Sequence, residues 1–268
     1  MTQPPSPVTT EPAITAGAPL AQYSLPAILG IWAAATIPMG VLAFVVAPAV
    51  MSRTTLHPGL VYWICMVVGM TWLFVLSLLL LRQELGGLRW DQVRARIRWQ
   101  SPRDARGRPR PALYWWVLPA IAVNLVGGLL AGPLDAALTT AFPILTEPSY
   151  TRIQGLVDAQ FRGQWWILGL ALVSALLNYV LGEELLFRGV LLPRMNGVFG
   201  RWDWVANTVL FGLYHVHKIW FLPSIVASSF GYAWTAKRYR SIWLAMIVHG
   251  VEGFYVFLVL AVIVGWLP

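Results

Sequence analysis

The stretch PGLVYWICMVVGMTWLFVLSLLLL, residues 58–81, contains no charged residue. A helix of this length extends about 36 Å at about 1.5 Å per residue, and the hydrocarbon core of a bilayer is about 30 Å thick. The whole chain has the same character, since 58% of its 268 residues are hydrophobic and 11% are charged. Soluble domains have about 45–50% apolar and about 25% charged residues. The sequence therefore excludes an ordinary soluble enzyme and predicts an all-α, polytopic transmembrane helical bundle.

Further apolar stretches follow the same pattern, and we expect about seven spans. They are residues 25–48, 58–81, 112–132, 168–194, 202–217, 222–236 and 242–266. Residues 1–23 hold no Lys or Arg and are rich in Pro and Thr, which indicates a disordered cytoplasmic tail rather than a signal peptide. Residues 24–268 then form a single transmembrane domain.

Lys and Arg are distributed unevenly between the two sides of the expected bundle. One side receives the Arg-rich loop 82–111, with nine Arg, and Arg188, Arg194, Arg201, Lys237, Arg238 and Arg240. The other side receives Arg53, Arg152, Arg162 and Lys218. The positive-inside rule therefore predicts a cytoplasmic N-terminus. We expect an integral membrane protein, in composition resembling those of a bacterial plasma membrane.

The Arg-rich loop contains an amphipathic segment. Trp90, Val93 and Ile97 recur at helical spacing with arginines between them. Such a segment is typical of a helix that lies on an anionic cytoplasmic leaflet, where each basic group contributes about 1 kcal/mol. An arm for nucleic acid or for a specific protein partner is the alternative, and we expect no nucleic acid.

Polar groups inside the spans are few, and they occur late in the chain. An ionisable residue there costs about 2.5–3.5 kcal/mol on insertion scales, so each is a functional candidate. Glu184 and Arg188 lie one helical turn apart and can form an ion pair. Glu183 points about 100° away from Glu184 on a regular helix. It has no partner in its own helix, and it is either a general base or a hydrogen-bonding partner of a neighbouring helix.

Two histidines in later spans complete a candidate site with Glu183. Alone, His215 or His249 would more often be a satisfied core residue. At about 1.5 Å per residue, Glu183, His215 and His249 all lie near the middle of the membrane if the fourth helix continues to Arg194. Gly182 is the expected point of bending. Convergence of one Glu and two His predicts a water-activating or metal-binding site.

These residues, in this order, resemble the CAAX protease and bacteriocin-processing family (CPBP, also called Abi) of intramembrane proteases, which includes the type II CAAX prenyl endopeptidases. The family pattern Glu-Glu-x-x-x-Arg matches residues 183–188, and Phe-x-x-x-His matches residues 211–215. The third pattern, His-x-x-x-Asn, matches His249 only, because position 253 is Gly. The core of the resemblance covers about residues 165–266.

The resemblance implies a hydrolase that cleaves a membrane-embedded or membrane-proximal peptide. Glu183 and His215 would activate a water, and His249 with the missing Asn would stabilise the oxyanion. Glu184 and Arg188 would hold the site. The family has been described as metalloproteases and as metal-independent glutamate proteases. Glu183, His215 and His249 suit either scheme, including a divalent metal such as zinc.

Gly253 departs from the family pattern at a position that would supply an oxyanion donor, which is commonly worth 10²–10³ in rate. Glu252, Asn207 and Asn178 are other candidates for that role. Two further functions compete with proteolysis. One is a non-catalytic membrane scaffold or immunity factor with the same fold, and the other is a proton-coupled transporter, which the absence of internal repeats disfavours.

Overall fold

In the computed structural model, residues 21–152 and 156–267 are described, and they contain helices but no β-strand. Five helices in this described part of the chain are long and apolar enough to cross a membrane. They are Leu25–Met51, Pro58–Leu85, Pro111–Ala141, Trp165–Arg194 and Ile242–Ile263. The prediction of an all-α transmembrane bundle is confirmed.

These long helices are built from shorter elements. The first joins α1 (Leu25–Val41), the π-helical turn η1 (Leu42–Val46) and α2 (Ala47–Met51), and α3 (Pro58–Leu85) is the second. The third joins the 3₁₀ turn η2 (Pro111–Trp116) to α5 (Val117–Ala141). The fourth joins α6 (Trp165–Leu176), η7 (Leu177–Leu181), η8 (Leu185–Leu191) and η9 (Leu192–Arg194). The last joins α11 (Ile242–Gly250), η12 (Val251–Phe254) and α12 (Tyr255–Ile263).

Short 3₁₀ turns and helices connect the spans. After α5 the chain forms η3 (Pro143–Leu145), η4 (Ser149–Thr151) and η6 (Ala159–Phe161). After the fourth span it forms α7 (Asn196–Phe199), η10 (Gly200–Trp202), α8 (Asp203–Tyr214), η11 (Val216–Phe221), α9 (Leu222–Ala227) and α10 (Phe230–Tyr239).

The predicted spans 202–217 and 222–236 do not form two straight crossings. The helical segments Asn196–Tyr214 and Val216–Ala227 are bent by 106°, so the count is five spans, or six if this pair is one broken span. Helix α8 has 12 residues and is about 18 Å long, which is too short to cross a core about 30 Å thick. The chain leaves helical geometry at His215 (φ −77°, ψ 38°). A count of seven is therefore not confirmed.

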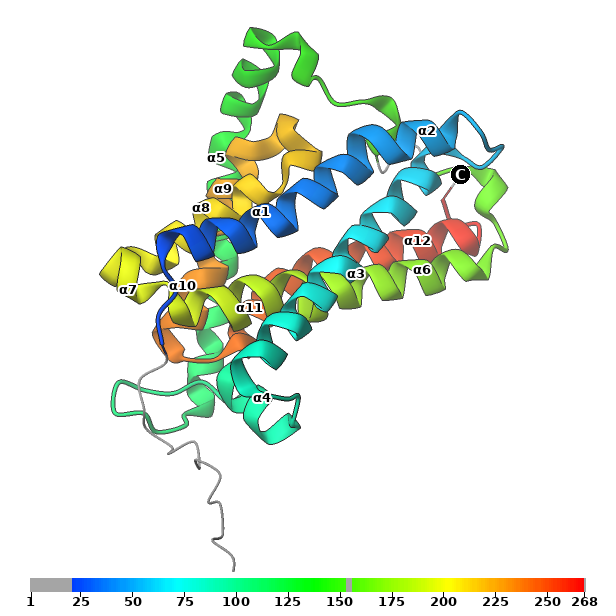
Figure 1. Ribbon diagram of the computed structural model, residues 1–268. Helices are drawn as coiled ribbons and strands as arrows, with labels where there is room; N and C mark the ends of the chain where they lie inside the picture. Colours follow the sequence, from blue (N-terminus) through cyan, green and yellow to red (C-terminus); the bar gives the residue numbers. More distant parts are fainter. Residues whose placement is uncertain (1–20, 153–155, 268) are drawn as a thin grey trace, which may run out of the picture.

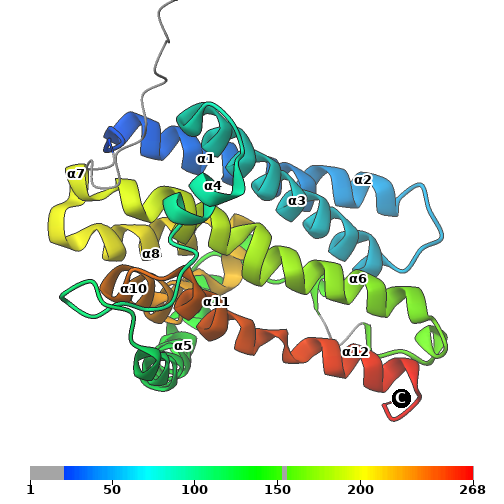
Figure 2. The ribbon, with the colours of Figure 1, turned by 90° about the horizontal axis from the view of Figure 1, so that it is seen from below.

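The fourth span occupies the centre of the bundle. It lies between α3 on one side and the α11–α12 helix on the other (Figure 2), and both contact it. Helix α5 crosses these helices steeply and packs against α9 and α10 (Figure 1). Side chains carried by the middle of the fourth span therefore face protein on several sides, away from lipid.

The amphipathic segment of the Arg-rich loop packs on protein. Helix α4 (Trp90–Arg96) carries Val93, and the next residue after it is Ile97; both join the main hydrophobic core. Arg96 is buried and its Nε lies 2.7 Å from Glu84 at the end of α3. The apolar face predicted to lie on lipid is thus covered, at Val93 and Ile97, by the bundle itself.

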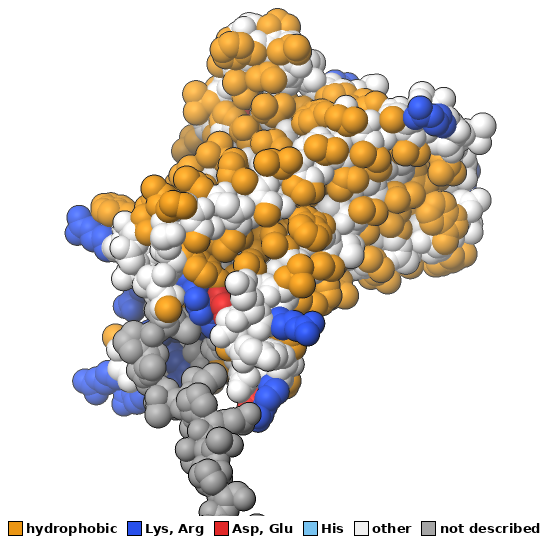
Figure 3. All heavy atoms as spheres, viewed as in Figure 1, with side chains coloured by type: hydrophobic (Ala, Val, Ile, Leu, Met, Phe, Trp, Pro, Cys, Tyr) orange, Lys and Arg blue, Asp and Glu red, His pale blue; other side chains and the backbone are white. Residues whose placement is uncertain are grey.

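The surface divides into an apolar flank and a basic end. Figure 3 shows hydrophobic side chains over the long flank and Lys or Arg gathered where the loop after α4 and α7 lie. We call this region the basic end; it includes Arg98, Arg201, Lys237, Arg238 and Arg240 around one cavity. Residues 1–20 of the predicted tail lie outside the described residues, while the backbone N–H of Tyr23 donates to the carbonyl of Arg194 at 3.0 Å.

Candidate active site

The fourth span changes its helical geometry where the candidate carboxylates lie. The π-helical turns η7 and η8 flank Gly182, Glu183 and Glu184. Such turns occur often at functional sites because they alter the direction of neighbouring side chains. A Cβ on Gly182 would lie 2.6 Å from the Leu177 carbonyl and 3.0 Å from that of Met70. Glycine at this position therefore lets the distorted helix lie directly against α3.

One carboxylate oxygen of Glu184 accepts hydrogen bonds from two side chains. Its Oε1 lies 3.0 Å from Nη1 of Arg188 and 2.9 Å from Nδ1 of His249, and the side chains of Glu184 and Arg188 are both 0% exposed. The guanidinium carbon of Arg188 lies 4.0 Å from the ring centre of Phe211. The ion pair predicted from the spacing is present, and it reaches across to α11 through His249.

Glu183 faces the second nitrogen of both histidines. Its Oε1 lies 3.8 Å from Nε2 of His215, and its Oε2 lies 3.9 Å from Nε2 of His249. These distances exceed a direct hydrogen bond, and a water can bridge groups so separated. All three residues are buried. The structure thus brings together Glu183, His215 and His249, which come from three separate elements.

Hydrogen bonds fix the orientation of the two imidazole rings. Nδ1 of His215 lies 2.9 Å from the carbonyl of Phe211, which can only accept. Nδ1 of His249 lies 2.9 Å from the Glu184 carboxylate. A proton on each Nδ1 satisfies both contacts, and in a neutral ring this leaves the Nε2 lone pair directed at Glu183.

Aromatic side chains enclose the site. Tyr232 of α10 stacks on His249 with ring centres 4.5 Å apart, and Tyr179 meets the same ring edge-on at 4.9 Å. Phe211 contacts both histidine rings edge-on. These rings hold the imidazoles in place.

Tyr214 is a further polar residue of the site that the sequence analysis missed. It is fully buried, and its hydroxyl lies beside Glu183 without a hydrogen bond of ordinary geometry among the described residues. The residue directly precedes His215, so a polar side chain next to a motif position was the only available signal. Its O–H can donate toward Glu183 or toward a group bound there.

The residues considered as replacements for the missing amide differ in placement. Asn207 is buried and its amide nitrogen points at the carbonyl of Phe187 (2.9 Å) and the sulfur of Met195 (3.5 Å), so its donors are committed to packing. Glu252 is 57% exposed at its side chain, and its Oε2 lies 3.9 Å from Nε2 of His249. Its other oxygen accepts from the Tyr232 hydroxyl.

Position 253 itself has restricted space. A Cβ on Gly253 would lie 3.2 Å from the ring of Tyr179, and that ring contacts His249. An asparagine there would need the tyrosine to shift by a few tenths of an ångström. The absence of a side chain at Gly253 therefore leaves room for Tyr179, which packs against His249.

Metal binding can be tested on the placement of the donor atoms. One carboxylate and two imidazoles are a donor set that zinc accepts. Among the described residues, however, no group of three His, Cys, Asp or Glu side chains is arranged so that it could hold a metal ion. Glu183, His215 and His249 stay the ligands predicted for a divalent metal, and these same protein groups can also act on a water directly.

Comparison with known proteins adds evidence for the same part of the chain. Residues 164–266 match a family model described as type II CAAX prenyl endopeptidase Rce1-like. No curated protein and no solved structure matches the chain. The matched segment contains Glu183, Glu184, Arg188, His215 and His249. The C-terminal part of this membrane protein, residues 164–266, is therefore similar to type II CAAX prenyl endopeptidases.

Proposed function

We propose that this protein hydrolyses a peptide bond of a membrane-associated protein or peptide with a water activated by Glu183 and His215. The observation that supports this proposal is that the buried carboxylate of Glu183 and two buried histidines face one another. Among the described residues no Lys or Arg lies within ion-pair distance of Glu183, which faces the Nε2 atoms of two oriented histidines. A structural carboxylate would be expected to have direct hydrogen bonds instead.

The reaction follows from what each group can donate or accept. Glu183 accepts a proton from the water, while the Nε2 lone pair of His215 holds the water in position. The resulting hydroxide adds to the carbonyl carbon of the peptide. When the C–N bond breaks, the proton on Glu183 passes to the leaving amine. The products are a new carboxyl end and a new amino end.

We assign to His249 the stabilisation of the oxyanion that forms when the hydroxide adds to the carbonyl carbon. Its ring is held by Glu184, which in turn is held by Arg188. When Nε2 carries a proton, it presents a donor on the same side as Glu183. The Tyr214 hydroxyl is a second donor at this position and is our candidate for the role that Gly253 cannot fill.

Substitution of Glu183 in a purified, reconstituted protein tests this proposal. The substrate is a library of membrane-proximal peptides, and mass spectrometry detects the products. Glu183→Gln, which keeps the size of the side chain, should lower the rate by about 10²-fold or more. The control Glu147→Gln changes a carboxylate that pairs with Arg152 in a loop, and it should retain the activity.

A chelator separates the two schemes that the family resemblance left open. We expect dialysis against a chelator to leave the rate unchanged. A loss of activity that zinc restores would instead assign Glu183, His215 and His249 as metal ligands and refute the metal-independent scheme.

Gly253 favours a non-catalytic scaffold as the second candidate function. No cleavage of any peptide by a folded protein, in an assay where a family protease is active, would support the scaffold and refute proteolysis. A transporter is disfavoured because the sequence contains no internal repeat of the kind that marks many transporters.

We infer further that the basic end faces the cytoplasm and that the membrane is a bacterial plasma membrane. The orientation is supported by the positive-inside rule applied to the arginines gathered there, and the kind of membrane by the composition of the chain. A reporter fused to the N-terminus that is active only in the cytoplasm tests the orientation. Activity only on the opposite side would reverse it.

A further inference from the structure

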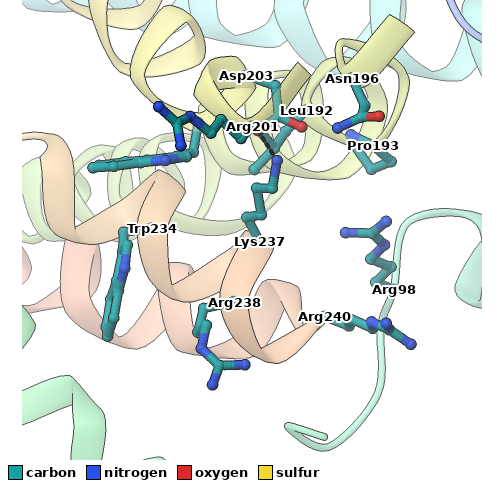
Figure 4. Close-up of a pocket in the computed structure, with 11 residues that line it drawn as sticks. Arg98, Leu192, Pro193, Asn196, Arg201, Asp203, Trp234, Lys237, Arg238 and Arg240 are labelled. Carbon is teal, nitrogen blue, oxygen red and sulfur yellow. Dashed lines mark hydrogen bonds and ion pairs between the residues drawn. The ribbon is translucent and has the colours of Figure 1, made fainter. Parts of the chain in front are cut away.

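A cavity of about 400 Å³ lies at the basic end, and no residue of the candidate active site lines it. Figure 4 shows the side chains of its lining. Three parts of the chain line it: the loop after α4, the segment from η9 to the start of α8, and the end of α10. Its charged residues are Arg98, Arg201, Asp203, Lys237, Arg238 and Arg240. Neither the proposed hydrolysis nor the motifs of the family resemblance involve any of them.

The charges of this cavity are not balanced. Asp203 is the one acidic residue in the lining, and it pairs with Lys237, as Figure 4 shows. Within the described part of the chain, no acidic side chain lies within ion-pair distance of the four arginines of the lining. Four positive charges are therefore left without a counter-charge. Burial, followed by repulsion from Arg240 and Arg96, lowers the pKa of Arg98.

The fold holds two of these arginines in position from the backbone. Arg98 and Arg240 have φ of 58° and 51°, a left-handed conformation that costs a non-glycine residue about 1–2 kcal/mol. Hydrogen bonds tie the two segments together: Ile242 N–H donates to the carbonyl of Arg98 at 3.1 Å, and the Gln100 amide donates to the carbonyl of Arg240 at 2.9 Å. In Figure 4 both guanidinium groups lie on the same flank of the cavity. Strain of this kind persists where surrounding structure enforces it, often at binding sites.

We propose that this cavity binds the phosphate group of an anionic phospholipid. Guanidinium groups form paired hydrogen bonds with phosphate oxygens, and several unpaired arginines are the side chains expected for this chemistry. The location favours a lipid over a soluble phosphate. Leu192 and Pro193, at the end of a membrane-spanning helix, line the cavity together with Trp204 and Trp234, and tryptophan is enriched at the level of lipid headgroups.

The bound phosphate would also stabilise the active-site region through α10. This helix carries Lys237 at the cavity and Tyr232 on the His249 ring. The loop after α4 closes the other side of the cavity. A phosphate held between them would join two segments that the backbone hydrogen bonds already bring together, so binding should raise the unfolding temperature of the whole protein.

Thermal unfolding of the full chain in detergent, followed by tryptophan fluorescence, tests the proposal. The probes are short-chain phosphatidylglycerol, short-chain phosphatidylcholine and sodium phosphate at equal concentrations. Phosphatidylglycerol should raise the unfolding temperature, and the other two should not. The variant Arg98→Gln/Arg240→Gln should need about 30-fold more phosphatidylglycerol for the same effect, since each basic group contributes about 1 kcal/mol and about 1.4 kcal/mol is a factor of ten.

A matched variant separates a site from general attraction between charges. Arg94→Gln/Arg106→Gln removes the same charge from exposed arginines of the same loop outside the cavity, and it should respond as the unchanged protein does. An equal loss in both variants would refute the site. An equal rise of the unfolding temperature with sodium phosphate would refute a lipid as the ligand.

A second double variant tests the same cavity in case Arg98→Gln/Arg240→Gln does not fold. Arg201→Gln/Arg238→Gln leaves both strained backbone positions unchanged and should weaken the response in the same direction. A full response in this folded variant and in Arg98→Gln/Arg240→Gln would refute the proposal. These outcomes are independent of proteolysis, because no step of the measurement uses peptide cleavage.

Discussion

Glu183 and Glu184 are neighbours in sequence, and the structure predicts different effects on stability when each is replaced by glutamine. Glu184 is the only acidic partner, among the described residues, within ion-pair distance of the guanidinium of Arg188, and both side chains are 0% exposed. Its loss leaves a buried positive charge uncompensated, which costs about 3–5 kcal/mol. It also frees the Nδ1 side of His249. Glu184→Gln should therefore lower both stability and activity.

Glu183→Gln should remove activity and leave stability within about 1 kcal/mol of the unchanged protein. Its histidine partners lie at 3.8 and 3.9 Å, and a glutamine oxygen can still accept from the neighbouring Tyr214 hydroxyl, so the change leaves no permanent charge unpaired. Reversible unfolding in mixed micelles measures the free energy of unfolding, and peptide cleavage measures activity. The two variants should thus differ by about 2–4 kcal/mol in stability.

A double substitution provides the control. Glu184→Leu/Arg188→Met removes both charges of the pair, and apolar replacements of a buried pair are often neutral or stabilising. The double variant should regain most of the stability lost in Glu184→Gln but none of the activity. Equal destabilisation by Glu183→Gln and Glu184→Gln would refute our division of roles, as would a double variant less stable than Glu184→Gln.

Three further outcomes are expected. Tyr214→Phe should retain the unfolding temperature and lower the cleavage rate by about 10-fold, since one aligned donor is lost; an unchanged rate would exclude the hydroxyl from the reaction. Gly182→Ala should cost about 1–3 kcal/mol in unfolding measurements because its Cβ would meet the Met70 carbonyl, and an unaffected stability would contradict the close approach. Gly253→Asn should raise turnover by about 10-fold if the amide reaches the oxyanion, at a small cost in thermal stability from contact with Tyr179; a stable variant with an unchanged rate would indicate that another donor already acts.

Local chemistry along the chain was sufficient to predict the fold class and to select Glu183, His215 and His249, which the structure brings together, but it did not reveal Tyr214. Uncharged runs such as residues 58–81 have few stable alternatives to a membrane-spanning helix, because an unpaired backbone group in lipid is costly. The spacing of Glu184 and Arg188 predicted their ion pair, which depends only on helical geometry. The sequence left the continuation of the fourth helix to Arg194 as a condition, and the structure meets it through π-helical and 3₁₀ turns.

Contacts between distant segments decided what periodicity could not. On a regular helix Glu183 and Glu184 point about 100° apart, yet both face His249, because π-helical turns flank them and α11 lies alongside. The 106° bend near His215 replaced two expected spans. The pairing of Arg98 with Arg240 around one cavity depends on hydrogen bonds across 140 residues of sequence, between Gln100 and Arg240. Such features depend on packing energies between elements, and no single stretch of sequence contains both partners.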